Sequence, residues 1–167
     1  MECATMIVSN STPLINFAAI QRLDILEQLF ATIYIPAAVK QEVLVKGAAY
    51  NSADEIRNAA FIRTMSIRNV ALFNSLRMDL DDGEAEAITL ALEQDAELVL
   101  LDEAAGRKTA KFHNLTMSGS IGCLATAKQQ GLITEIKPIL NMMQDKARYW
   151  LSKSLYQHVL LKCDELG

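Results

Sequence analysis

Short apolar runs alternate along the chain with longer segments whose apolar residues recur at helical spacing. The short runs are bounded by polar residues, as buried strands commonly are. The pattern therefore predicts strands over residues 5–8, 32–35, 61–67, 98–101 and 115–117.

The segments between these runs predict helices, and several carry recognisable start signals. Ser11 or Thr12 is a suitable cap for a helix that has Pro13 in its first turn. Ser52 and Glu55 have the spacing of a capping box. Helices are expected over residues 13–20, 23–30, from 36, from 52, 69–78, 81–94, after 102, 119–131, and in two pieces over 135–165 that are broken near 149–152.

Alternating strands and helices indicate a parallel sheet with helices on both faces. The expected fold is an α/β, three-layer α/β/α sandwich on a mainly parallel sheet. With 167 residues and no internal repeat or linker, the chain is expected to form one domain over 1–167. Residues 135–167 are expected to be a helical C-terminal extension packed on that domain.

Composition favours a packed globular protein. Hydrophobic residues make up 51% of the chain and charged residues 22%, which argues against disorder. The formal net charge of -4 means that binding to nucleic acid requires a local basic patch. No apolar run approaches the roughly 18 residues of a membrane span, so no membrane association is expected. The three cysteines, Cys3, Cys123 and Cys163, form no CxxC motif and are expected to be buried free thiols. Free thiols and the lack of a signal-peptide pattern suit a cytoplasmic location.

Acidic residues occur where predicted strands and helices meet. Asp102 follows the fourth strand, and Glu84 and Glu86 lie in the first turn of the helix before it. Glu42 lies in the helix after the second strand, and Asn10 follows the first strand. The tips of neighbouring parallel strands share one edge of a sheet, so these side chains are expected to converge. Clustered carboxylates need a cation, and oxygen ligands of this kind suit Mg²⁺ or Mn²⁺.

Each of these residues also has an ordinary structural interpretation. Acids at the start of a helix, here Asp81, Asp82 and Glu84, cap it or complement its dipole. Asp102 can cap the helix that follows it, and Glu42 can be a solvated helix residue. Asn10 can serve as a turn residue. The residues alone leave both interpretations open.

Basic residues lie beside the predicted site. Arg107, Lys108 and Lys111 fall on the helix after Asp102, where they are placed to contact a phosphate near the metal; a solvated basic face is the alternative. Ser120 lies in the sequence GSIG at the start of the next helix. Backbone N–H groups at a helix N-terminus can bind a phosphate, although a tight turn explains the glycines as well.

Motifs of several other enzyme classes are absent from the sequence. The chain contains no GxxxxGK(S/T), no GxGxxG after a strand and no GxSxG. Nucleotide hydrolases of the P-loop type, dinucleotide-dependent enzymes and hydrolases with a nucleophile elbow are therefore poor interpretations.

Four segments carry a family resemblance in their order along the chain. They are IVSNSTPLINFAAIQRLDILEQLF, IPAAVKQEVL, DDGEAEAITLALEQDAELVLLDE and SGSIGCLATAKQQGLI. Together they resemble the PIN-domain family, in particular a PIN-like prokaryotic branch, from about residue 6 to the C-terminus. The resemblance implies a small α/β/α sandwich and a Mg²⁺- or Mn²⁺-dependent endoribonuclease, as in the VapC-type toxins of toxin–antitoxin pairs.

The resemblance also implies roles for individual residues. It places metal-binding and catalytic acids at Glu42, Glu84 and Asp102, with Glu86 as a close neighbour that assists or substitutes for Glu84. It places a hydroxyl that often accompanies the site at Ser120. The implied mechanism is in-line attack of a metal-activated water on an RNA phosphodiester.

The chain departs from the family pattern at the first acidic position. The family has an acid in a VSDTSPLI-like string, whereas this chain has VSNSTPLI with Asn10 at that position. An amide oxygen can bind a divalent cation but brings no negative charge, so metal binding and hydrolysis are expected to be weakened or lost. The alternative function is a catalytically inactive PIN-like RNA-binding or protein-interaction module. The family also implies RNA, a small antitoxin protein and a second copy of the chain as partners.

Overall fold

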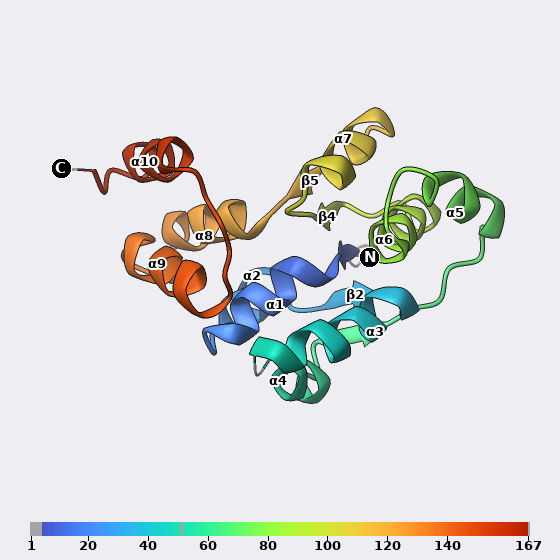
Figure 1. The fold of residues 1–167 in the computed structure, drawn as a ribbon, viewed down its shortest axis with the longest axis horizontal. Coiled ribbons are helices and arrows are strands. Elements are labelled where there is room, and N and C mark those ends of the chain that lie inside the picture. Colours follow the sequence, from blue (N-terminus) through green and yellow to red (C-terminus); the bar gives the residue numbers. More distant parts are fainter. Residues whose placement is uncertain (1–4, 51, 167) are drawn as a thin grey trace.

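Short parallel strands form the central sheet of the molecule (Figure 1). A computed structural model of the protein describes residues 5–50 and 52–166. Within these residues the strand order is β3-β2-β1-β4-β5. Every neighbouring pair is parallel, and Val8 in the central strand is in register with Tyr34 on one side and Val99 on the other. The strands are β1 (Ile7–Ser9), β2 (Ile33–Ile35), β3 (Ile62–Thr64), β4 (Leu98–Leu100) and β5 (Met117–Ser118).

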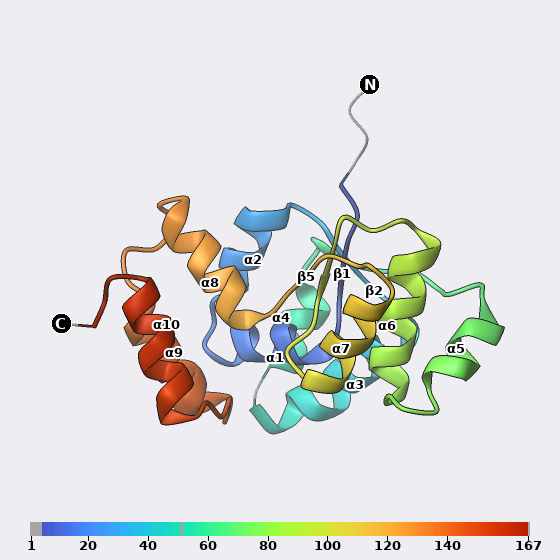
Figure 2. The same cartoon turned by 90° about the horizontal axis from the view of Figure 1, so that it is seen from above.

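Helices connect the strands and flank the sheet, which confirms the expected α/β sandwich. Figure 2 shows α8, α9 and α10 grouped at one end of the molecule and α5 and α6 at the opposite end. In the described part of the chain the helices are α1 (Ser11–Ala19), α2 (Leu23–Phe30), α3 (Ala37–Lys46), α4 (Ala53–Asn58), α5 (Val70–Leu76), α6 (Asp82–Glu93), α7 (Ala104–Phe112), α8 (Ser120–Gln129), α9 (Lys137–Lys146) and α10 (Lys153–Lys162), with a 3-10 helix η1 (Gly47–Tyr50).

The apolar faces of these elements meet in one continuous core. Residues of the central strands pack against α1, α2, α6, α8 and α9. The largest side chains that are fully buried are Leu14, Phe17, Ile25, Leu26, Ile33, Ile88, Leu90, Leu100, Leu101, Leu124, Ile136 and Leu140. The alternation of buried strands with amphipathic helices that the sequence displays therefore builds the scaffold that holds the sheet's carboxyl edge.

Several boundaries differ from the sequence-based expectation. The first strand extends to Ser9, and the third is confined to Ile62–Thr64. An apolar pattern reports burial, whereas a strand also requires pairing with a neighbour. Asn10, rather than the following hydroxyl residues, is the N-cap of α1.

The expected capping box at the start of α4 is not formed. The Ser52 side chain makes no capping hydrogen bond; its hydroxyl donates to the Ile15 carbonyl at 3.3 Å. Ser52 therefore ties the segment before α4 to α1. The preceding loop also contains η1, which the sequence pattern did not predict.

The C-terminal helices are anchored by an acid near the end of the chain. The Glu165 carboxylate accepts hydrogen bonds from the backbone N–H groups of Ile136 and Lys137, at 2.7 and 2.8 Å, where α9 begins. It also pairs with Lys128 of α8 at 3.0 Å. The two helical pieces expected in this region are α9 and α10, and the break between them includes the predicted one. The division of the chain into one domain with a C-terminal extension stays a prediction.

Two further expectations concern membranes and cysteines. None of the helices within residues 5–50 and 52–166 is long and apolar enough to cross a membrane. Cys123 is buried and Cys163 is partly buried, and both are free thiols. Cys3 lies outside the described residues.

Candidate functional site

The strand order reverses at β1 and β4, whose carboxyl ends lie side by side. The chain leaves β1 toward β2 on one side, and β4 later returns to the other side of β1. Ligands of open parallel sheets bind at such a reversal of strand order. Asn10 follows β1 directly, and its backbone N–H donates to the Leu100 carbonyl at 3.0 Å. Asp102 lies two residues beyond β4, so Asn10 and Asp102 follow the two neighbouring strands at this reversal.

The Asp102 carboxylate is held by donors from two helices. Ser120, the first residue of α8, donates its backbone N–H to Oδ1 at 2.7 Å and its hydroxyl to Oδ2 at 2.6 Å. Asn16 of α1 donates its side-chain amide to Asp102 Oδ2 at 3.3 Å and to the Ser120 hydroxyl at 3.1 Å. These contacts fix the orientation of the carboxylate. They also commit the Ser120 hydroxyl proton to Asp102.

Asp102 lies in a partly buried electrostatic environment. Burial raises its pKa above the usual range, although the hydrogen bonds from Ser120 and the charge of Arg107 oppose that rise. The Arg107 guanidinium donates to the Leu101 carbonyl at 3.0 Å, which keeps the cation beside the carboxylate. A cavity of about 400 Å³ adjoins Asp102 and is lined in part by Arg107 and Tyr149. Tyr149 comes from the segment between α9 and α10, so the C-terminal part of the chain reaches the site.

Glu42 forms a second group of contacts, which join α3 to α1 and α6. Its Oε2 accepts a hydrogen bond from the Ser11 hydroxyl at 2.6 Å, and its Oε1 accepts from the Gly83 N–H at 3.2 Å. Lys46, one turn further along α3, lies 3.9 Å from Oε2. The carboxylate thereby joins the start of α1 to the first turn of α6.

Glu84 and Asn10 contribute buried oxygens that lack hydrogen-bond partners. Glu84 is 7% exposed and Asn10 is 2% exposed. Glu84 Oε2 and Asn10 Oδ1 have no partner among the described residues. Buried acceptors are usually satisfied, so these two oxygens at one sheet edge are available to a hydrogen-bond donor or a cation. The only other such oxygen in the described residues belongs to Glu93, at the far end of α6, which bonds the start of α5.

The environment of Glu84 disfavours its charged form. Burial is the main cause, and the neighbouring acids Asp81, Glu103 and Glu42 add to it. Together they raise the pKa of Glu84 to about 8. Asp81 is the N-cap of α6, where its side chain accepts a hydrogen bond from the Glu84 N–H at 2.8 Å. The capping interpretation of the α6 acids is therefore correct for Asp81, whereas Glu84 is turned inward.

Three glycines lie directly against the three carboxylates. A Cβ atom added to Gly83 would come within 2.3 Å of Glu42 Oε1, and one added to Gly119 would come within 2.5 Å of Asp102 Oδ1. Gly106 stands in the same relation to Glu84 Oε2, at 2.8 Å. The helices supply these glycines at the points where the acids need space.

Glu86 does not join this cluster. It lies two residues after Glu84 on α6, and its Oε2 accepts a hydrogen bond from the Ala38 N–H at 2.7 Å, in the first turn of α3. Its carboxylate therefore satisfies a helix N-terminus. On α7, Arg107 is engaged as described, while Lys108 and Lys111 are exposed and make no ion pair within the described residues.

The oxygen donors fit a hard divalent cation held by few protein ligands. No group of three or more Asp, Glu, His or Cys side chains in the described ranges is arranged to hold a metal ion. Magnesium commonly binds through one or two carboxylates and keeps several waters, so a three-carboxylate cage is unnecessary. The orphaned oxygens of Glu84 and Asn10 supply one carboxylate and one amide for such an ion.

The chain belongs to the PIN-domain family. A family model described as PIN domain matches residues 6–165, which is nearly the whole sequence. No curated protein matches the chain. PIN domains form a nuclease-type family, they often bind RNA and they generally use divalent metal ions.

Sequence reasoning missed two residues of this site. Asn16 is 3% exposed and lies within the apolar stretch LINFAA, where a buried amide needs partners; that mismatch is the available signal. Tyr149 lies far along the chain in a segment between helices, and no local pattern connects it with Asp102.

The raised pKa of Glu84 predicts a pH-dependent stability. Between about pH 4.5 and 8 the folded protein keeps a proton that the unfolded chain loses, so the free energy of unfolding should fall as pH rises through this window. The fall is expected to reach at most about 5 kcal/mol, because each unit of pKa shift corresponds to about 1.4 kcal/mol. Glu84→Gln should remove it. Urea denaturation across this pH range measures the effect, with the exposed Glu27→Gln as the matched control; identical pH profiles for the parent and Glu84→Gln would refute it.

Proposed function

We propose that the chain is an endoribonuclease that depends on Mg²⁺ or Mn²⁺. The observation that carries this proposal is the pair of orphaned, buried oxygens of Glu84 and Asn10 at the reversal of strand order. Membership of a nuclease-type family supports the same conclusion. Phosphodiester hydrolysis is the reaction for which such a family would use a hard cation.

We assign the cation to Glu84 and Asn10, with Asp102 and Glu42 at its sides. Glu86 is left out because its carboxylate is bound to the first turn of α3. When bound, the ion would lower the pKa of a water and neutralise charge on the phosphate. Glu84 would release its proton on binding, since its raised pKa disfavours the charged form only while no cation is near.

The remaining residues would orient groups and bind RNA. Asn16 and Ser120 hold the Asp102 carboxylate in one orientation. Ser120 therefore acts through Asp102, because its hydroxyl and N–H are both bound to it. Lys108 and Lys111 are exposed cations on α7 and would contact the RNA backbone. Lys108 and Lys111 would therefore form the local basic patch that RNA binding requires in a chain with a net charge of -4.

The biological setting that we propose is that of a toxin in a toxin–antitoxin pair. The partners would be cellular RNA, a small antitoxin protein and a second copy of the chain, in the cytoplasm. Family membership supports this setting.

A second candidate is a catalytically silent module that binds RNA or protein. Asn10 favours this silent module, because this chain has an amide at the position where the family has a carboxylate. The engagement of Asp102 and Glu42 in internal hydrogen bonds favours it as well.

The test is cleavage of unstructured and structured RNA by the purified protein with Mn²⁺, with Mg²⁺ and with a chelator. Cleavage that requires the metal and stops with the chelator is the expected result. Metal-induced thermal stabilisation, measured without RNA, should accompany it, since a cation that binds only the folded protein stabilises it by mass action. Absence of cleavage under every condition would favour the silent module.

A further inference from the structure

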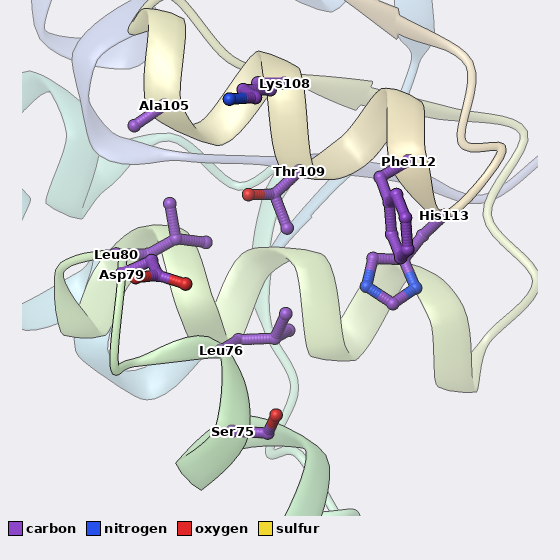
Figure 3. A pocket seen from close by; sticks show the side chains of 9 residues that line it. All are labelled: Ser75, Leu76, Asp79, Leu80, Ala105, Lys108, Thr109, Phe112 and His113. Carbon is purple, nitrogen blue, oxygen red and sulfur yellow. The ribbon is translucent and has the colours of Figure 1, made fainter.

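A groove outside the acidic cluster opens between α5 and α7 (Figure 3). Its volume is about 580 Å³. Leu76 and Leu80 line one wall, and Lys108, Thr109, Phe112 and His113 line the other. Figure 3 shows Thr109 and Phe112 directed from α7 toward the wall that carries Leu76 and Leu80. The proposed metal site uses none of these side chains except Lys108, as a phosphate contact.

Phe112 presents an exposed aromatic ring beside the groove. It is 81% exposed at the end of α7. Its ring stands edge-on to His113, with ring centroids 5.3 Å apart and an interplanar angle of 84°. With 81% of the residue exposed, the Phe112 ring is accessible to a planar group. An exposed aromatic ring beside a groove is a common feature of binding surfaces.

The charge on α7 favours an anionic occupant. The helix carries Arg107, Lys108 and Lys111 and no acidic residue, and of these three cations Lys108 lines the groove. Asp79 faces the groove from the opposite wall, so the cationic character belongs to the α7 side. A nucleotide has both of the parts that this groove can bind: a planar base for Phe112 and an anionic phosphate for Lys108.

The groove leads away from the acidic cluster along one helix. Gly106, in the first turn of α7, lies against Glu84 Oε2, and Ala105 beside it lines the groove. Leu80 precedes Asp81, the cap of α6, and lines the other wall. The six residues from Gly106 to Phe112 rise about 9 Å. A polynucleotide whose phosphate lay at the cluster would therefore enter the groove next.

We propose that the groove between α5 and α7 binds an unpaired nucleotide of single-stranded RNA, with its base stacked on Phe112 and its phosphate on Lys108. The proposal rests on the proposed ribonuclease function for the identity of the neighbouring site. Bases inside a duplex have no free face for an aromatic side chain, so double-stranded RNA would not use this groove. Stacking of this kind is tolerant of base identity.

The test is binding of a labelled, unstructured oligoribonucleotide in the presence of a chelator, measured by fluorescence anisotropy. Phe112→Ala should weaken binding by roughly tenfold. Phe112→Trp should restore the affinity, whereas Phe112→Leu, which keeps apolar bulk without a π face, should not. Trp150→Ala is the matched control, because Trp150 is an aromatic residue with the same exposed fraction of 81%; it should bind as the parent does.

Four outcomes of the binding assay would overturn the proposal. They are no binding of single-stranded RNA by the parent, equal affinity of Phe112→Ala and the parent, full rescue by Phe112→Leu, and equal loss of duplex and single-strand binding in Phe112→Ala. If Phe112→Ala changed the molecular mass of the protein in solution without changing its RNA affinity, the groove would belong to a protein partner. That result would also overturn the proposal.

The assay separates this proposal from the nuclease assignment. Because binding is measured with a chelator, it does not require cleavage. Phe112-dependent binding without cleavage by the parent would keep the groove and remove the nuclease function. Metal-dependent cleavage with no effect of Phe112 would keep the nuclease function and remove the groove.

Discussion

Replacing Asp102 with asparagine is expected to reduce metal-dependent RNA cleavage by roughly a hundredfold to a thousandfold. The carboxylate accepts hydrogen bonds on both oxygens, and an amide offers only one acceptor oxygen and no charge. The amide nitrogen of Asp102→Asn would also face the Asn16 donor. Initial rates of cleavage of an unstructured RNA with Mn²⁺ measure the loss.

The fold should survive this substitution. The lost hydrogen bonds cost on the order of 1–3 kcal/mol, which thermal unfolding can detect. Asp24→Asn is the matched control, because Asp24 is exposed and paired only with Arg22 on the surface. Unchanged cleavage in a folded Asp102→Asn protein would place the catalytic site elsewhere.

Replacing Asn10 with aspartate is expected to tighten Mn²⁺ binding by roughly tenfold to a hundredfold. A new carboxylate near a divalent cation contributes on the order of 1–4 kcal/mol at the dielectric of a protein surface. Cleavage should rise with the affinity if the chain is the proposed nuclease. Calorimetric titration with Mn²⁺ measures the affinity without relying on cleavage.

The same substitution should act in the opposite direction when the metal is removed. An added negative charge beside Glu84 raises the pKa of Glu84 further and lowers the stability of the metal-free protein at high pH. Asn69→Asp is the matched control, since Asn69 is also a helix N-cap but lies at the start of α5. Equal Mn²⁺ affinity in the parent and Asn10→Asp would show that the amide of Asn10 does not weaken metal binding.

The layered fold could be predicted because burial and secondary structure leave regular patterns. The strand order could not, because it depends on which strands pair, and the placement of β4 beside β1 is what brings Asn10 near Asp102. Asp81 could be recognised as a cap because capping is local. The sequence left the choice between Glu84 and Glu86 open. Side chains two residues apart on a helix point to different sides. Only the position of α3 in the fold shows that Glu86 accepts a hydrogen bond from it.

Helix α1 connects the two halves of the acidic cluster and sets the distance between them. Ser11 binds Glu42, and Asn16 binds Asp102, so one rigid segment touches both. Five residues of helix rise about 7.5 Å, a spacing that no loop movement can alter. Deleting one residue between Ser11 and Asn16 would rotate the Asn16 amide by about 100° away from Asp102 while Ser11 stayed in place. Helix α1 therefore fixes the spacing between the two halves of the acidic cluster. Displacement of one half would move the other half through the helix.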